Sequence, residues 1–251
     1  MRKTMKRLKQ LLGFTMLTSA MMAGAAHAET TVSGNVALAS DYVFRGISQT
    51  NTEPAVQGGF DVAADIFYAG VWASNLSGYL ASNYELDLYA GVKPTLGPVS
   101  LDLGLVGYFY PGANDSGSEL DYYEAKAAAS IAPAEGLSLG GALYYSPEFY
   151  GETGAGFYLE VNASYALSEA VTFSGAFGQQ SIDDVDGPAT GTADDDYTTW
   201  NLGAAYAISG FTLDLRYIGS SIEAADNIVT SGFTTTDNSD ETLVLTVKRA
   251  L

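Results

Sequence analysis

Residues 83–93 have the sequence NYELDLYAGVK, in which apolar or aromatic side chains alternate with polar ones. One face of this stretch would carry Tyr84, Leu86, Leu88, Ala90 and Val92, and the other face Glu85, Asp87, Tyr89 and Lys93. Successive side chains of a β-strand point to opposite faces of the sheet, so this period of two predicts a strand with one apolar and one polar face.

The same alternation recurs along the rest of the chain, and the connections between the alternating stretches are in turn long and short. The predicted strands are 31–45, 55–64, 67–74, 83–93, 99–109, 122–131, 137–145, 157–165, 171–179, 198–208, 211–219 and 242–251. A meander with tight turns at one end and long loops at the other is typical of outer-membrane proteins. The prediction is therefore an all-β fold, a single antiparallel up-and-down transmembrane β-barrel of twelve strands, with short periplasmic turns and long extracellular loops.

The N-terminal residues have the pattern of a secretion signal. Basic residues at positions 2, 3, 6, 7 and 9 precede an apolar run from Leu11 to Ala25, and Ala26-His27-Ala28 offers the small-x-small pattern of a signal peptidase site. We expect residues 1–28 to be cleaved between Ala28 and Glu29, leaving residues 29–251 as the outer-membrane β-barrel. A membrane-anchoring helix is the alternative interpretation of the same run.

Charge and residue types exclude several classes of function. Of 11 basic and 29 acidic residues, five basic ones lie in the predicted signal, which leaves six against 29 and a net charge of −23. A chain with this much negative charge repels the phosphate backbone of nucleic acids, and we therefore expect no nucleic-acid partner. The chain has no cysteine, and its one histidine, His27, lies in the signal. Disulfides, histidine-based zinc sites and histidine general bases are therefore excluded, and we expect no cofactor, no metal site and no catalytic residues.

Two further patterns support the barrel. All seven prolines fall in the predicted connections, as expected if every strand uses its ladder hydrogen bonds. Aromatic residues gather near both ends of the predicted strands, where outer-membrane barrels carry two girdles. The expected girdles comprise Tyr42, Phe44, Phe109, Tyr110, Tyr122, Tyr123, Tyr144, Tyr145 and Trp200 near the long loops, and Tyr68, Tyr165, Phe173, Tyr206 and Phe211 near the short turns.

If the apolar faces contact lipid, the polar faces line the barrel interior. The candidate pore-lining residues are Asp41, Arg45, Asp61, Glu85, Asp87, Lys93, Asp102, Glu124, Lys126, Glu160, Asp214, Arg216 and Lys248. Eight acids and five bases favour small cations or polar solutes over anions. Asp41 and Arg45, four residues apart near the long loops, mark a place for a constriction. The alternative is that these charges pair and brace the wall, and one lumen can do both.

The chain resembles the TorF family of porins, small outer-membrane barrels of proteobacteria. The resemblance rests first on VSGNVALASDYVFRGISQTNTEPAVQGGFD (residues 32–61), then on FYAGVWASN (67–75), YELDLYAGVK (84–93) and YYSPEFYG (144–151). It covers essentially the whole predicted mature chain, and the DYVFRG block is its most specific part. The resemblance implies a channel-like role and supplies no catalytic residues.

These observations predict an outer-membrane porin of a Gram-negative cell that passes small polar solutes or ions by passive diffusion, with a weak preference for cations. We expect it to contact outer-membrane lipids and lipopolysaccharide, and the barrel-assembly machinery during export. The alternative is a non-conducting structural or surface-binding barrel whose acidic loops, 181–197 and 220–241, bind divalent cations or lipopolysaccharide. Asp184-Val185-Asp186-Gly187 resembles a fragment of a calcium loop but lacks the remaining ligands, which favours a solvated acidic loop.

Overall fold

The strands of the chain form one closed antiparallel barrel. The computed structural model describes residues 30–77, 82–113, 119–183, 196–222 and 238–251. The long strands are β1 (Thr31–Ala39), β4 (Ala55–Ala64), β5 (Phe67–Asn75), β6 (Tyr84–Val92), β8 (Val99–Phe109), β9 (Tyr122–Ala134), β10 (Leu137–Ser146), β11 (Gly156–Ala166), β12 (Val171–Ile182), β13 (Asp196–Ile208), β14 (Phe211–Ser220) and β15 (Thr242–Ala250). Three two-residue strands complete the set, namely β2 (Val43–Phe44), β3 (Ile47–Ser48) and β7 (Thr95–Leu96).

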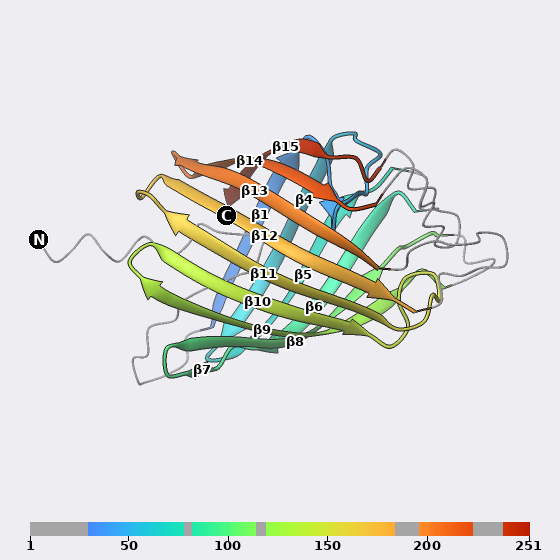
Figure 1. Ribbon diagram of the computed structural model, residues 1–251, viewed down its shortest axis with the longest axis horizontal. Coiled ribbons are helices and arrows are strands. Elements are labelled where there is room, and N and C mark those ends of the chain that lie inside the picture. Colours follow the sequence, from blue (N-terminus) through green and yellow to red (C-terminus); the bar gives the residue numbers. More distant parts are fainter. Residues whose placement is uncertain (1–29, 78–81, 114–118, 184–195, 223–237) are drawn as a thin grey trace, which may run out of the picture.

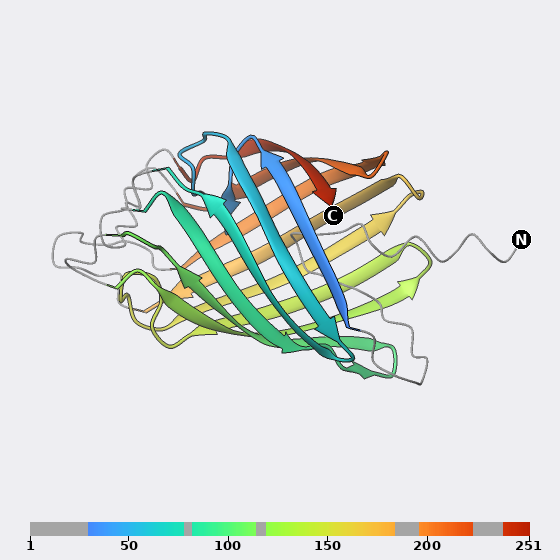
Figure 2. The same cartoon turned by 180° about the vertical axis from the view of Figure 1, so that it is seen from behind.

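Each long strand pairs with its neighbours in the sequence, and the first and last strands close the ring. β1 lies between β4 and β15, and β6 pairs directly with β8, so the twelve long strands leave no unpaired edge. The strands tilt across the barrel wall, and the tight turns gather at one end while the longer connections gather at the other (Figure 1, Figure 2). Both ends of the closing pair, Thr31 and Ala250, lie at the short-turn end, which confirms the predicted up-and-down topology.

The outer surface of the barrel is apolar. Exposed large side chains come from alternate positions of the strands, for example Val32, Val36 and Leu38 of β1 and Leu103 and Leu105 of β8. Such a band is what a lipid bilayer requires of a barrel exterior. Among the residues that the structure describes, no helix is long and apolar enough to cross a membrane.

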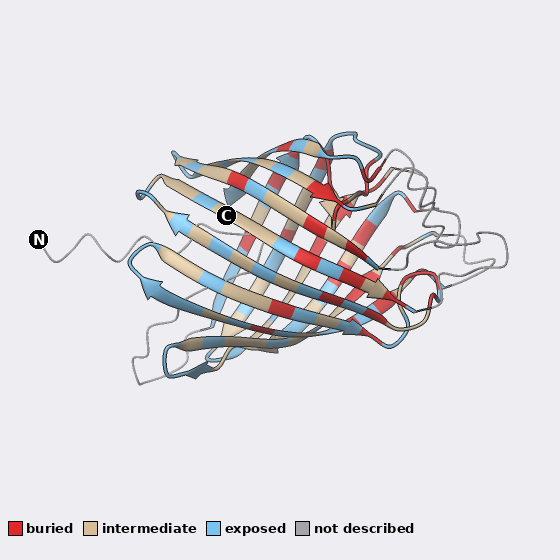
Figure 3. Cartoon of the chain, viewed as in Figure 1, coloured by how far each residue is buried: buried red, intermediate tan, exposed pale blue. Residues whose placement is uncertain are grey.

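The interior is packed mainly at one end. Figure 3 shows the buried residues gathered toward the long connections, whereas the strand ends at the short turns are mostly exposed or intermediate. The principal buried cluster joins residues of the wall, such as Trp72, Tyr108 and Tyr122, to Tyr42 of the first long connection. The first long connection therefore contributes to a core that lies inside the barrel.

Several strand bounds differ from the prediction, and two of the differences have a clear physical reason. The first strand ends at Ala39, not at Arg45, because the chain turns inward after Ser40 and forms the separate β2–β3 pair. Pro133 lies within β9 instead of a connection, at a shift of the β9–β10 register between Leu137 and Leu139. A bulge is one of the few places in a sheet that tolerates the missing proline N–H.

The predicted aromatic girdles are only partly observed. Tyr165, Phe173, Tyr206 and Phe211 are exposed near the short turns, and Tyr123 and Tyr145 near the long connections. By contrast, Tyr42, Tyr110 and Tyr122 are buried inside the barrel, and the hydroxyl of Tyr68 donates to Asp102 on the polar face. Tyr68, Tyr110 and Tyr122 are in phase with the polar residues of their strands, whereas Tyr42 lies beyond the end of β1 in the connection that turns inward.

Some predictions fall outside the described residues. They are the signal at 1–28, the cleavage between Ala28 and Glu29, and most of the acidic loops 181–197 and 220–241, including the calcium-loop fragment 184–187.

Candidate functional site

The segment 41–50, here called the inward hairpin, folds into the barrel from the long-connection end. Its two strands β2 and β3 are joined by Arg45 and Gly46, whose φ angles are 45° and 81°. Two consecutive positive φ values are typical of the tight two-residue turns of β-hairpins. Below the turn, Asp41 Oδ1 accepts hydrogen bonds from Ser48 Oγ at 2.6 Å and from Thr50 Oγ1 at 2.8 Å, which ties the two arms together.

The inward hairpin contacts opposite sides of the wall. On one side the ring of Tyr42 lies 5.2 Å from that of Trp72 on β5, and the ring of Phe44 lies 5.8 Å from that of Tyr108 on β8. On the other side the tip reaches β14, because a Cβ built on Gly46 would lie 2.8 Å from Ser220 Cβ. The same built Cβ would lie 3.3 Å from Thr199 Cγ2 on β13. The hairpin therefore crosses the lumen and narrows it at this level.

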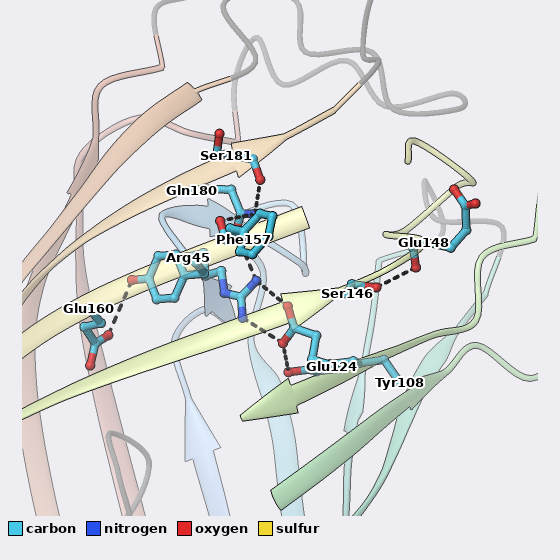
Figure 4. A network of polar contacts seen from close by, with 10 residues as sticks. Arg45, Tyr108, Glu124, Ser146, Glu148, Phe157, Glu160, Gln180 and Ser181 are labelled. Atoms are coloured by element: carbon cyan, nitrogen blue, oxygen red, sulfur yellow. Dashed lines mark hydrogen bonds and ion pairs between the residues drawn. The ribbon is translucent and has the colours of Figure 1, made fainter. Parts of the chain in front are cut away.

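Arg45 at the tip is the centre of a network of polar contacts. Its Nη1 and Nη2 donate to the two carboxylate oxygens of Glu124 on β9, both at 2.7 Å, and Nη1 also donates to Gln180 Oε1 on β12 at 2.9 Å. Figure 4 shows the guanidinium between these two side chains, with Tyr108 donating to Glu124 from the other side at 3.0 Å. A bidentate arginine–carboxylate pair of this kind fixes the orientation of the guanidinium as well as its distance from the carboxylate.

Aromatic rings complete the surroundings of Arg45. Its Cζ lies 4.3 Å from the centroid of the Tyr158 ring and 5.1 Å from that of Tyr144. Such cation–π contacts are stronger where water is excluded, and Glu124 is only 1% exposed. The tip of the hairpin is thus held by four neighbouring strands, β9 to β12.

Acidic groups outnumber basic ones at the level of the inward hairpin. Glu85 and Asp87 on β6 are 2% and 7% exposed, and they join Asp41 and Glu124 opposite the single guanidinium of Arg45. Burial, together with the charge of Glu85, raises the pKa of Tyr42, which keeps its hydroxyl a neutral donor to Glu85 Oε1 at 2.7 Å. Asp87 Oδ1 has no hydrogen-bond partner among the described residues.

The remaining candidate pore-lining residues lie closer to the short turns and are half-buried, here called the lower group. Its members are Asp61, Lys93, Asp102, Lys126, Glu160, Asp214, Arg216 and Lys248. Four are acidic and four basic, so this group has no net charge. Each of the thirteen candidates is buried or half-buried, and none is exposed.

Contacts between strands bind much of the lower group together. Asp102 Oδ2 accepts from Lys126 Nζ at 2.8 Å and lies 4.0 Å from Lys93 Nζ. Burial lowers the pKa of Lys93, which lies in the turn after β6. These contacts support the bracing role that the sequence left open.

The other contacts of the lower group join either different strands or nearby residues of one strand. Arg216 donates to Asp214 at 3.1 Å and also to Asn201 and Ser174 on neighbouring strands. Asp61 accepts from Tyr89 at 2.7 Å, and Glu160 accepts from Asn162 at 3.1 Å.

Sequence reasoning missed the uncharged wall partners of the Arg45–Glu124 pair, which are Gln180, Tyr144 and Tyr158 around Arg45 and Tyr108 beside Glu124. The available signal was their phase, since each alternates in step with inward polar residues of its own strand; Tyr158 and Glu160 share a face of β11, for example. Within the described ranges, no group of three or more histidine, cysteine, aspartate or glutamate residues could hold a metal ion.

The barrel has the fold of known porins. A solved "KdgM porin" matches with a TM-score of 0.53 at 10% identity, over 87% of this chain and 97% of that one. A "KdgM porin in complex with disordered oligogalacturonate" matches with a TM-score of 0.51 at 8% identity, over 88% and 96%. At this identity the likeness concerns the fold alone.

Comparison with sequences places the chain in a family whose function has not been assigned. No protein of curated function matches it. A family model described as "Bacterial protein of unknown function (Gcw_chp)" matches residues 23–251. The chain is therefore a member of the Gcw_chp family of bacterial proteins.

Proposed function

We propose that this protein is a porin-like channel of the bacterial outer membrane, through which small polar solutes or ions diffuse passively. The observation that carries the proposal is the closed barrel with an apolar exterior, on which none of the thirteen charged candidates is an exposed residue. A barrel of this size lies between the filled eight-stranded barrels and the open porins of 16–18 strands. The inward hairpin then sets the narrowest level of the path.

A weak preference for cations belongs to the same proposal. The level of the inward hairpin carries four carboxylates and one guanidinium, and the lower group is balanced. A ring of carboxylates at a constriction attracts cations and repels anions. Oligogalacturonate, the polyanion in one of the similar porin structures, is therefore a poor fit, and we propose neutral or cationic solutes instead.

The proposal includes the route to the membrane and the expected partners. Residues 1–28 would direct export and be removed between Ala28 and Glu29, and assembly machinery would then insert residues 29–251 among outer-membrane lipids and lipopolysaccharide. The resemblance to TorF porins in the DYVFRG block agrees with this role. The same block forms most of the inward hairpin.

Swelling of vesicles that contain the refolded protein tests the proposal. Vesicles loaded with an impermeant polymer and placed in isotonic solutions of neutral sugars of graded size should swell quickly with the smallest sugar and more slowly with larger ones. A matching series with a zwitterionic, a cationic and an anionic solute of similar size should rank the anion last. Vesicles with correctly folded barrel that swell no faster than empty vesicles would refute the channel.

One observation favours a second function, a barrel that is closed at rest. Tyr42, Tyr108, Tyr110 and Tyr122 are all buried at the level of the inward hairpin, so side chains fill much of that cross-section. A barrel that never opens would serve as a structural or surface-binding protein whose acidic loops bind divalent cations or lipopolysaccharide. Removal of divalent cations by a chelator would then weaken surface binding, whereas conductance would be absent with or without them.

A further inference from the structure

We infer that the inward hairpin is a movable plug, and that the contacts of Arg45 with Glu124 and Gln180 are the latch that holds it closed. This inference rests on the proposed channel function and adds how the channel is regulated. It concerns a segment within the described residues whose aromatic rings pack against the wall along its length and whose tip adds the charged contacts of Arg45.

The inward hairpin is a separate unit of structure. β2 and β3 pair only with each other and form a two-stranded sheet outside the ladder of the barrel. The root is closed internally, since Asp41 binds Ser48 and Thr50, and Gln49 N donates to Tyr42 O at 2.6 Å. Two backbone hydrogen bonds tie the hairpin to other connections, from Ser48 N to Asn238 O at 2.7 Å and from Ser77 N to Gln49 O at 3.1 Å, whereas moving its tip would leave every strand pairing of the barrel wall intact.

The root and the tip are held differently. At the root, Tyr42 packs against Trp72 in the principal apolar cluster, and exposing these rings to water is unfavourable. At the tip, Phe44 packs against Tyr108 and the charged contacts run to Glu124 and Gln180. Water that enters when the tip moves can solvate both charges, which offsets much of the lost attraction of the buried pair. The segment is therefore expected to pivot about its root, with the tip leaving the far wall first.

The surface beneath the plug suits a cation path. When the tip leaves, the guanidinium of Arg45 leaves with it, and Glu85, Asp87 and Glu124 remain on the wall. Glu85 and Asp87 lie on one face of β6, and Asp87 Oδ1 has no partner among the described residues even in the closed state. A released tip thus leaves Asp87 and Glu124 without the guanidinium at the mouth of the lumen, while Glu85 keeps its hydrogen bond with Tyr42 at the root; both conductance and cation preference then rise.

A reversible disulfide between the tip and the far wall tests the inference. The chain has no cysteine, so the pair Gly46→Cys and Ser220→Cys introduces the only two thiols. Their Cβ atoms would start 2.8 Å apart, and a shift of about 1 Å reaches disulfide geometry. Single-channel currents of the double variant are recorded oxidised and then reduced in the same bilayer. Each single cysteine variant is the matched control for the strain at position 46 and for the lost hydroxyl at position 220.

The inference predicts little or no current in the oxidised double variant and a several-fold rise on reduction, with no response of the single variants to reductant. Arg45→Ala and Glu124→Ala should each increase the open fraction relative to the parent, in support of the latch. Equal, non-zero currents before and after reduction would overturn the movable plug and retain the channel, because the hairpin would then be a fixed constriction.

A deletion variant separates failure of the plug from failure of the channel. Residues 41–50 are replaced by a short glycine-serine linker, which keeps all twelve long strands. Currents from this variant, together with silence of the reduced double variant, would overturn the latch alone. Silence of the deletion variant in its folded form would overturn both the latch and the proposed channel.

Discussion

At the scale of single residues, Arg45 has the most demanding environment in the lumen. Its guanidinium is removed from water and paired through two hydrogen bonds with a carboxylate that is itself buried. A buried pair is only weakly stabilising as a whole, because desolvation offsets the attraction, but removal of one partner leaves a buried charge without compensation. The two partners should therefore depend strongly on each other.

Replacement of Glu124 by glutamine tests this dependence. Glu124→Gln keeps the shape but removes the charge opposite Arg45, and should lower the free energy of unfolding by roughly 3–5 kcal/mol. Urea unfolding in lipid vesicles, followed by tryptophan fluorescence, measures the loss. The double variant Arg45→Met with Glu124→Met should recover most of it, since apolar side chains of similar size remove the unpaired charge. A glutamine variant as stable as the parent would show that water already solvates Arg45.

Gly104 shows how a glycine admits an aromatic side chain inside the barrel. A Cβ at this position would lie 2.6 Å from the hydroxyl of Tyr68, which donates to Asp102 Oδ1 at 2.7 Å. Gly104→Ala should push the ring away, weaken that bond and lower stability by about 1–3 kcal/mol in the same unfolding assay. Gly141→Ala is the control, since the nearest atom to its built Cβ lies at 3.2 Å. Equal losses in the two variants would contradict this packing account.

At the scale of elements, the alternation of side chains predicted the long strands well because each of them lies between two different environments. A strand with one face on lipid and one on a polar lumen must alternate, so the existence and approximate bounds of the long strands follow from the period. The position of the inward hairpin, by contrast, does not follow from this alternation. Tyr42 and Phe44 continue the alternation of β1 in sequence, yet they are held by tertiary contacts with Trp72 and Tyr108.

The candidate site was predictable to a similar extent. The period of two was enough to predict an inward position for the charged residues of the strands, and the segment around Asp41 and Arg45, where a constriction was expected, forms the inward hairpin. The partner of Arg45 was not predictable, because Glu124 is 79 residues away and the pairing depends on the closure of the barrel. The sequence around Arg45 indicates a turn at Arg45-Gly46, but it does not indicate which distant residue pairs with the guanidinium.

Charged substitutions on the outer face test whether that face contacts lipid. Leu105 lies near the middle of β8 and is 64% exposed, so Leu105→Lys should cost about 2–4 kcal/mol of stability in vesicles. Leu96→Lys, at the short-turn end on β7, should cost about 0–1 kcal/mol, because a lysine near the interface reaches water. Unfolding in vesicles compares the two. A Leu105 variant as stable as the Leu96 variant would contradict a lipid-facing wall.

At the scale of the whole molecule, the charges of the lumen fall into two levels with different balance. Four carboxylates and one guanidinium lie at the inward hairpin, while the lower group has four of each sign. Selectivity should therefore be decided at the hairpin, and the lower group should mainly stabilise the wall through contacts such as that of Lys126 with Asp102.

Neutralising one carboxylate at each level separates these roles. Asp87→Asn removes an acid that has an unpaired oxygen, and should move the reversal potential in a salt gradient toward zero. Asp214→Asn removes the same charge from a pair with Arg216, and should change the reversal potential less while lowering stability more. The opposite order of effects on the reversal potential would show that the lower group decides selectivity.

The central claim is that the barrel conducts, and single-channel recording of the refolded mature protein, residues 29–251, in a planar bilayer under a salt gradient tests it most directly. We expect discrete current steps, interrupted by closures, and a reversal potential whose sign shows that cations pass more readily than anions. A correctly folded barrel that gives no steps, both as the parent and after removal of residues 41–50, would contradict the claim and leave a structural or surface-binding barrel.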